Sequence, residues 1–264
     1  MLILNICDNI QAFIIGRRYT ASDMGYYSQA RKLEMVPAQS ISYVVNLVTF
    51  PVFSRLQDSK EQLYIAVRKS LRCMNYLNFP LMSLLIVIAE PLIILLFSDK
   101  WLPSVPYFRI LCLVGFVNCL QSVNYQVVCA AGRSKEIFKW NIFKRIVGIA
   151  MILIGMHWGI EGLMYGMVCS MYFTYIVNAL VAKTTTGYTL LMQIKDAIPL
   201  LFICGLSCIF AHLAGLYVEC SNFIMILLQT SIYLVCYLLL SILTKREELM
   251  EYREIIKSIF KFHM

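Results

Sequence analysis

Charged residues are scarce in this chain of 264 residues. Asp, Glu, Lys and Arg together make up 14% of the sequence and hydrophobic residues 60%, against about 25% and 45–50% in soluble domains. The apolar residues recur in runs of roughly 18–25 residues, enough to cross about 30 Å of hydrocarbon as a helix. The ten-residue alternation typical of a membrane β-barrel is missing. The composition excludes a soluble domain and predicts an all-α integral membrane protein.

The sequence also lacks the motifs of common enzymes and metal sites. It contains no HExxH, GxSxG, P-loop or DxD-like element, and its ten cysteines show no CxxC spacing. The connections between apolar runs are short, except after the second run, so little room remains for a catalytic loop outside the membrane. We therefore predict no catalytic residue, no metal site and no cofactor, and a protein that is not an enzyme.

Eight apolar runs predict eight transmembrane helices. They lie near residues 3–17, 36–53, 74–97, 105–131, 142–158, 163–181, 198–218 and 223–243. Since no linker rich in Gly, Ser or Pro separates them, residues 1–264 are predicted to form one transmembrane domain. Residues 57–73 are predicted to form an amphipathic helix on the cytoplasmic face, and residues 245–264 a cytoplasmic tail. Gly162 and Gly166 form a small-xxx-small pair, which predicts a close helix contact.

Basic residues are distributed unevenly among the predicted connections. Seventeen of the 23 Lys and Arg residues follow spans two, four and six or lie in the tail, with Lys144 and Arg145 counted in the connection after span four. Cytoplasmic loops carry the excess of basic residues in membrane proteins, so both termini are predicted to be cytoplasmic. Basic loops beside an anionic leaflet also account for the net charge of +8 without a nucleic-acid partner, and they make membrane lipids the expected neighbours.

The first fifty-odd residues carry polar side chains that a lipid-facing helix would not tolerate. These are Asp8, Arg17, Arg18, Arg31 and Asn46. Ionisable groups at membrane depth cost roughly 2.5–3.5 kcal/mol each, so they normally face a bundle interior or a water-filled cavity. We predict that these residues line a substrate cavity.

The fourth predicted span adds a polar stripe to this set. Arg109 precedes Asn118, Gln121 and Asn124, and positions 118, 121 and 125 share one helix face. Arg109, Asn118 and Gln121 are predicted to line the same cavity. Hydrogen bonding between helices is the alternative for the amides, and it stays open at this point.

Several short sequence motifs in the N-terminal part of the chain resemble those of a known family. In order they are Asp8, IIGR at residues 14–17, MGYYSQA at 24–30, FPVFSRLQD at 50–58 and KWLP at 100–103. Together they resemble the seventh and eighth membrane helices of bacterial polysaccharide flippases, the O-antigen and exopolysaccharide branch of the multidrug/oligosaccharidyl-lipid/polysaccharide exporter superfamily. Family members are about twice this length, so the resemblance implies a C-terminal half: one lobe of a two-lobe transporter plus two extra helices, without the N-terminal half.

The resemblance also implies a function. The expected substrate is an oligosaccharide repeat unit on an undecaprenyl-diphosphate carrier, moved across the bacterial inner membrane by alternating access. An ion gradient would drive the cycle, with Asp8 as a candidate proton or sodium site, and polysaccharide polymerase machinery would be a partner. Cationic groups suit such a substrate because guanidinium groups bind phosphate in bidentate fashion.

Two alternatives remain open from the sequence. One is another branch of the same superfamily, such as a multidrug or lipid II exporter. The other is a membrane protein of cell-envelope assembly that transports nothing. The identity of the sugar cannot be read from polar amides, because amides hydrogen-bond to many glycans.

Overall fold

The computed structural model describes residues 15–218 and 220–244, and within this part the secondary structure is helical throughout. After residues 15–18, the helices are α3 (Ala21–Leu56), α4 (Lys60–Val87), α5 (Ala89–Phe97), η1 (Asp99–Trp101), α6 (Ser104–Ala130), α7 (Ser134–Gly155), η2 (Met156–Trp158), α8 (Gly159–Thr186), α9 (Leu190–Tyr217) and α10 (Asn222–Leu243). The predicted all-α class is confirmed.

Helix boundaries follow local chemistry. The Thr20 hydroxyl accepts a hydrogen bond from the Asp23 amide at 3.1 Å, and the Asp23 carboxylate accepts one from the Thr20 amide at 3.2 Å. This reciprocal pair satisfies amides that the first turn of α3 would leave without partners. The C-terminal end of α8 is capped by Gly187, whose φ of 80° lies in the left-handed region that favours glycine.

The helices are long and apolar enough to span a membrane. Among the described residues, five helical segments meet this condition, or six when the bent pair α4 and α5 counts as one span. One of the five is the 52-residue run Lys135–Thr186, which comprises α7, η2 and α8. The chain folds back between α7 and α8, so these helices correspond to two of the predicted spans. The first predicted span lies almost entirely outside the described residues.

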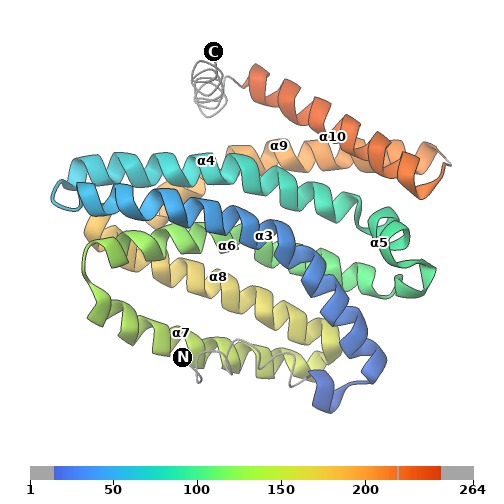
Figure 1. Cartoon of the computed structure of the whole chain (residues 1–264), viewed down its shortest axis with the longest axis horizontal. Coiled ribbons are helices and arrows are strands. Elements are labelled where there is room, and N and C mark those ends of the chain that lie inside the picture. Colours follow the sequence, from blue (N-terminus) through green and yellow to red (C-terminus); the bar gives the residue numbers. More distant parts are fainter. Residues whose placement is uncertain (1–14, 219, 245–264) are drawn as a thin grey trace.

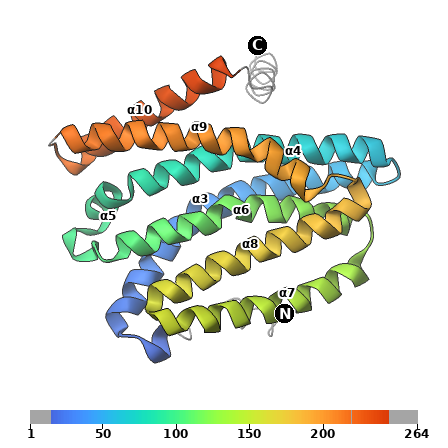
Figure 2. The same cartoon turned by 180° about the vertical axis from the view of Figure 1, so that it is seen from behind.

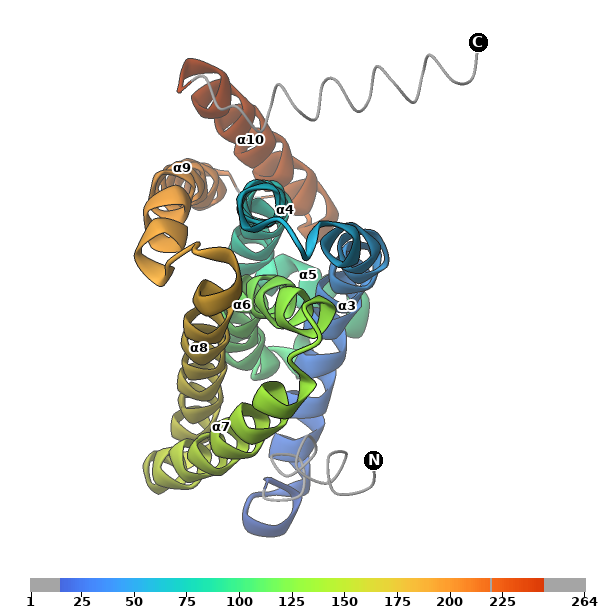
Figure 3. The same ribbon diagram turned by 90° about the vertical axis from the view of Figure 1, so that its left-hand side faces the viewer.

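The bundle has two groups of helices that meet at α6 and α4. Helix α6 packs between α3 and α8, and α7 packs along α8 (Figures 1 and 2). Helices α9 and α10 form a hairpin that packs on α4 and α5, away from α7 (Figure 3). The connections after α3, α6 and α8 lie at one end of the bundle, which brings the basic residues of these connections together at that end.

Small residues allow α7 and α8 to approach closely. A Cβ atom on Gly166 would lie 2.7 Å from the carbonyl oxygen of Met151 in α7, and one on Gly162 would meet the backbone of Gly155. Such contacts leave no room for a side chain, so the two backbones can touch only at glycine. The close contact predicted for Gly162 and Gly166 is confirmed.

The predicted third span is bent. Helix α4 ends at Val87, and α5 starts at Ala89 with an axis turned by 71°. Pro91 explains the position of the break, since its ring excludes the carbonyl of Val87 four residues earlier and it has no amide hydrogen to donate. Residues 57–73 are predicted to form an amphipathic helix that leads into this span. Residues 60–73 are the first half of α4 and continue directly into it, with Leu63, Val67 and Leu71 buried.

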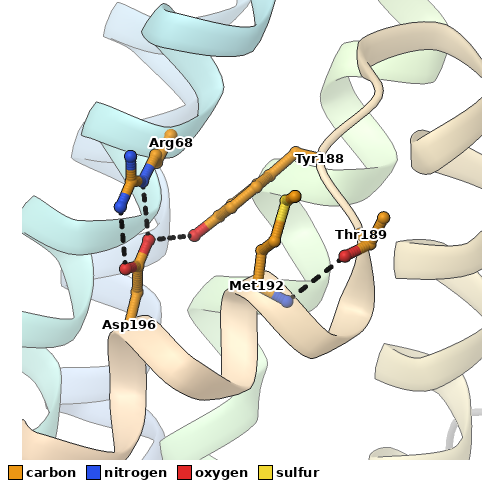
Figure 4. Close-up of polar contacts among 5 residues, drawn as sticks. All are labelled: Arg68, Tyr188, Thr189, Met192 and Asp196. Carbon is orange, nitrogen blue, oxygen red and sulfur yellow. Dashed lines mark hydrogen bonds and ion pairs between the residues drawn. The ribbon is translucent and has the colours of Figure 1, made fainter.

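A partly buried polar cluster ties α4 to the start of α9. The Arg68 guanidinium donates two hydrogen bonds to the Asp196 carboxylate, from Nε at 2.8 Å and from Nη2 at 3.0 Å (Figure 4). The Tyr188 hydroxyl donates to the same carboxylate at 2.7 Å. Burial, helped by this hydrogen bond, raises the pKa of Tyr188, so its hydroxyl stays protonated and remains a donor. Bidentate pairs of this kind fix the geometry of both partners.

Candidate functional site

A cavity of about 550 Å³ lies between α3, α6, α7 and α8. Each of the four helices contributes polar side chains to it. They are Arg31, Glu34 and Gln39 from α3, Asn118, Gln121 and Tyr125 from α6, Asn141, Lys144 and Arg145 from α7, and Ser170, Thr174 and Asn178 from α8. Its volume is within the usual range for small-molecule sites, and convergent polar groups line it inside a membrane bundle. The cavity is therefore the best candidate for a binding site.

A chain of hydrogen bonds crosses one wall of this cavity. The Lys144 ammonium donates to the Asn178 side-chain oxygen, and the Asn178 amide donates to the backbone and side-chain oxygens of Gln121, both at 3.2 Å. Gln121 in turn donates to Asn118 at 3.3 Å. The chain links α7, α8 and α6 and fixes the orientation of each amide that faces the cavity.

Lys144 is the most unusual member of this wall. Only 6% of its surface is exposed, and its ammonium lies 6.0 Å from the centroid of the Tyr125 ring. Within the described part of the chain no carboxylate pairs with it. Burying an ammonium costs several kcal/mol even after the protein relaxes, and one neutral amide compensates only part of that cost. The arrangement leaves a cation available to an anionic group in the cavity.

The opposite wall carries charges on α3. Arg31 is half-buried and Glu34, one turn later, is 5% exposed. Glu34 packs against Gly115 of α6, since a Cβ atom on Gly115 would lie 3.3 Å from a carboxylate oxygen of Glu34. Among the described residues, the cavity lining thus holds three cations, Arg31, Lys144 and Arg145, against the one carboxylate of Glu34. This balance favours an anionic or hydroxyl-rich ligand over a cationic one.

The structure brings together three of the residues predicted from the sequence. Arg31, Asn118 and Gln121 line the cavity. Arg17 and Arg18 are exposed before α3 and do not line it. Asp8 and the side chain of Asn46 lie outside the described residues.

Arg109 and Asn124 lie elsewhere in the bundle. The Arg109 guanidinium donates to the carbonyl of Ile86 at 3.3 Å, near the end of α4. Asn124 exchanges two hydrogen bonds with Gln193 of α9, at 3.0 and 3.1 Å, and so joins helices rather than facing the cavity. The polar stripe of α6 therefore divides, with Asn118 and Gln121 at the cavity and Asn124 in helix packing.

Sequence reasoning missed four of the residues that carry the cavity. Glu34 was not singled out, and Lys144 and Arg145 were assigned to a basic connection, whereas both lie well inside α7. Asn178 completes a regular pattern in which Ser170, Thr174 and Asn178 recur every four residues on α8. That spacing places them on one helix face and would have indicated a polar wall.

Comparisons with known proteins agree with the family resemblance of the sequence motifs. Residues 1–106 match a family described as "Polysaccharide biosynthesis protein". The chain is 29% identical over 147 residues to the lipopolysaccharide biosynthesis protein WzxC of Escherichia coli, covering 56% of this chain and 30% of WzxC. It is 27% identical over 209 residues to the succinoglycan biosynthesis transport protein ExoT of Rhizobium meliloti, covering 78% of this chain and 40% of ExoT. No solved structure matches the chain.

A further relative extends the same pattern. The teichuronic acid biosynthesis protein TuaB of Bacillus subtilis is 29% identical over 133 residues, which cover 50% of this chain and 28% of TuaB. The matches therefore span well under half the length of each of these relatives, and this partial coverage fits the half-length correspondence that the sequence motifs imply. The predicted resemblance is confirmed: the chain is related to the bacterial polysaccharide biosynthesis and export proteins.

Proposed function

We propose that the chain forms part of a transporter that moves lipid-linked oligosaccharide repeat units across the bacterial inner membrane. The observation that carries this proposal is the cation-rich polar cavity between α3, α6, α7 and α8, in a chain related to WzxC, TuaB and ExoT. The expected ligand is a glycan on undecaprenyl diphosphate. Its phosphates match the cations of Arg31 and Lys144, and its hydroxyls match the amides of Asn118, Gln121 and Asn178.

Alternating access is the mechanism that we propose for this cavity. The cavity would face a second half of the transporter, and rocking of the two halves would expose it to each side of the membrane in turn. An ion gradient would drive the cycle. The carboxylate of Glu34 lies in the cavity, so Glu34 joins Asp8 as a candidate ion site. The chemistry is binding and release, so no catalytic group is required.

The orientation of the chain in the membrane is part of the same proposal. The connections after α3, α6 and α8 share one end of the bundle (Figure 1). Arg133 lies in one of them, and Arg55, Lys60, Lys135 and Lys183 lie in the helix ends beside them. We assign this end to the cytoplasm, because basic connections stay on that side. A reporter that fluoresces only in the cytoplasm, fused after residue 264, should be bright. A dark fusion with an active periplasmic reporter at the same site would reverse the assignment.

Export by a matched pair of variants tests the function. The gene encoding the chain, with any in-frame upstream sequence, should restore surface glycan in a flippase-deficient host. Arg31→Gln should reduce export about tenfold to a hundredfold, which corresponds to loss of one charge-assisted contact of roughly 1.5–3 kcal/mol. Lys32→Gln is the control, because the neighbouring Lys32 is exposed and does not line the cavity.

The alternatives predict different results in this experiment. Equal export by the two variants at equal membrane abundance would contradict a substrate contact for Arg31. Failure to restore surface glycan, with gain of resistance to a cationic drug, would identify a multidrug exporter. Failure in both assays would favour a membrane protein of cell-envelope assembly that transports nothing.

A further inference from the structure

A second hollow of about 420 Å³ lies on the seam between α3 and α6. Six described residues line it: Tyr43, Leu47 and Phe50 from α3, and Tyr125, Gln126 and Cys129 from α6. None of the six is charged, and only Gln126 and the two tyrosine hydroxyls are strongly polar. Tyr43 and Leu47 are 66% and 59% exposed. The hollow is therefore an open apolar groove, in contrast to the polar cavity.

The groove and the cavity are continuous along this seam. Tyr125 lines both. On α3, positions 31, 35, 39, 43, 47 and 50 recur at intervals of three or four residues, so successive members are neighbours on a strip that winds slowly around the helix. The first three line the cavity and the last three line the groove. This strip of α3 therefore leads from the polar cavity to the apolar groove.

The length of this track is comparable to the thickness of a bilayer. From Arg31 to Phe50 the helix rises about 28 Å at 1.5 Å per residue, against roughly 30 Å of hydrocarbon. The groove residues come later in α3 and α6 than the cavity residues, so the groove lies nearer the connections after these helices. Under the proposed orientation that end faces the cytoplasm, the side from which the substrate is loaded.

We propose that the groove binds the isoprenoid chain of the substrate while the cavity binds its diphosphate and sugars. A single molecule with an anionic, hydroxyl-rich head and a long apolar chain matches both parts of the track, and Tyr125 lies where the two meet. Among the described residues, the cavity lining offers three cations and several amides, which is more polar partners than a single phosphate group needs. This inference rests on the proposed function, because it takes the lipid-linked glycan as the ligand.

Photocrosslinking at three positions tests the proposal. A diazirine amino acid replaces Leu47 in the groove, Met35 in the cavity, or Leu239 on α10. Leu239 is the matched control, since it is a leucine of similar exposure, 55%, that lines neither hollow. The probe is a radiolabelled undecaprenyl-diphosphate oligosaccharide added to the purified protein in nanodiscs. Positions 35 and 47 should be labelled and position 239 should not, and excess phospholipid should not compete.

Each other outcome has a definite meaning. Labelling at position 35 but not at position 47 above the level of position 239 would overturn the groove and leave the proposed function standing. Competition by phospholipid at position 47 would show that the groove is ordinary lipid-facing surface. Absence of labelling at position 35 would contradict the proposed function itself, and the groove proposal with it.

A binding measurement separates a chain contact from a structural effect. Leu47→Gln should weaken binding of the full-length lipid-linked oligosaccharide about tenfold, as expected for losing the burial of about two methylene groups. Binding of an analogue with a short isoprenoid chain should not change, because that chain would not extend into the groove. Leu239→Gln should leave both affinities unchanged. Equal weakening of both ligands by Leu47→Gln would refute a specific contact with the chain.

Discussion

Replacing Lys144 by methionine should separate stability from transport. Lys144 is 6% exposed, and within the described residues its ammonium donates a hydrogen bond to Asn178. Methionine has a similar length and fills the same space without the charge. Lys144→Met therefore removes one cation from the cavity and disturbs the packing of α7, α6 and α8 little.

The expected effect on stability follows from two opposing terms. Burial of an ammonium costs several kcal/mol, and a hydrogen bond to a charged group contributes roughly 1.5–3 kcal/mol. The Asn178 amide nitrogen keeps its two hydrogen bonds to Gln121 in the variant, and only the Asn178 side-chain oxygen loses its donor. The desolvation cost should exceed the lost hydrogen bond, so we expect the free energy of unfolding to rise by about 1–2 kcal/mol.

The expected effect on export has the opposite sign. If Lys144 contacts the diphosphate or an acidic sugar, the variant loses a charge-assisted contact of roughly 1.5–3 kcal/mol, which is about tenfold to a hundredfold in affinity. A more stable protein that transports less is typical of a residue retained for function. A residue retained for packing would lose stability and transport together.

The assay compares three proteins at matched membrane abundance. Wild type, Lys144→Met and Lys139→Met are scored for surface glycan and for thermal unfolding in detergent. Lys139 is the control because it is an exposed lysine on the same helix and lies outside the cavity lining. Lower thermal stability of Lys144→Met, with export falling only as far as abundance, would refute the assignment of Lys144 as a ligand contact.

Three further predictions concern packing, the polar cluster and the N-terminal arginines. Gly162→Ala should destabilise the protein by about 1–3 kcal/mol, because its Cβ would meet the backbone of α7. Gly205→Ala should stabilise the protein by about 0.5–1 kcal/mol, because its Cβ would meet no atom within 4 Å. Thermal unfolding of the two variants tests both expectations. Asp196→Asn should lower the free energy of unfolding by about 1–2 kcal/mol, because it removes a bidentate ion pair; this value is already reduced for the partial exposure of Arg68. Unchanged unfolding would show that solvent replaces the pair. Arg17→Ala should reduce export more than Lys100→Ala if Arg17 contacts substrate, and equal surface glycan from the two variants at equal abundance would leave Arg17 without that role.

The sequence alone determined the class of the protein and the positions of most helices. The predicted spans at 105–131 and 223–243 agree closely with α6 and α10, because a long apolar run must form its backbone hydrogen bonds internally in a membrane and so becomes a helix. The relation to polysaccharide exporters was likewise readable from the motifs between Asp8 and Pro103, since they depend only on the order of residues.

Only the tertiary structure decided which polar residues share a cavity. Lys144 looked like one more charge of a basic connection, yet helix α7 starts before it and packing on α8 turns its side chain inward. Arg109 looked like a cavity residue, yet it contacts the α4 backbone beside the break before α5. Hydropathy averages over all faces of a helix, whereas the face that meets a neighbour depends on crossing angles and close contacts such as that of Gly155 with Gly162.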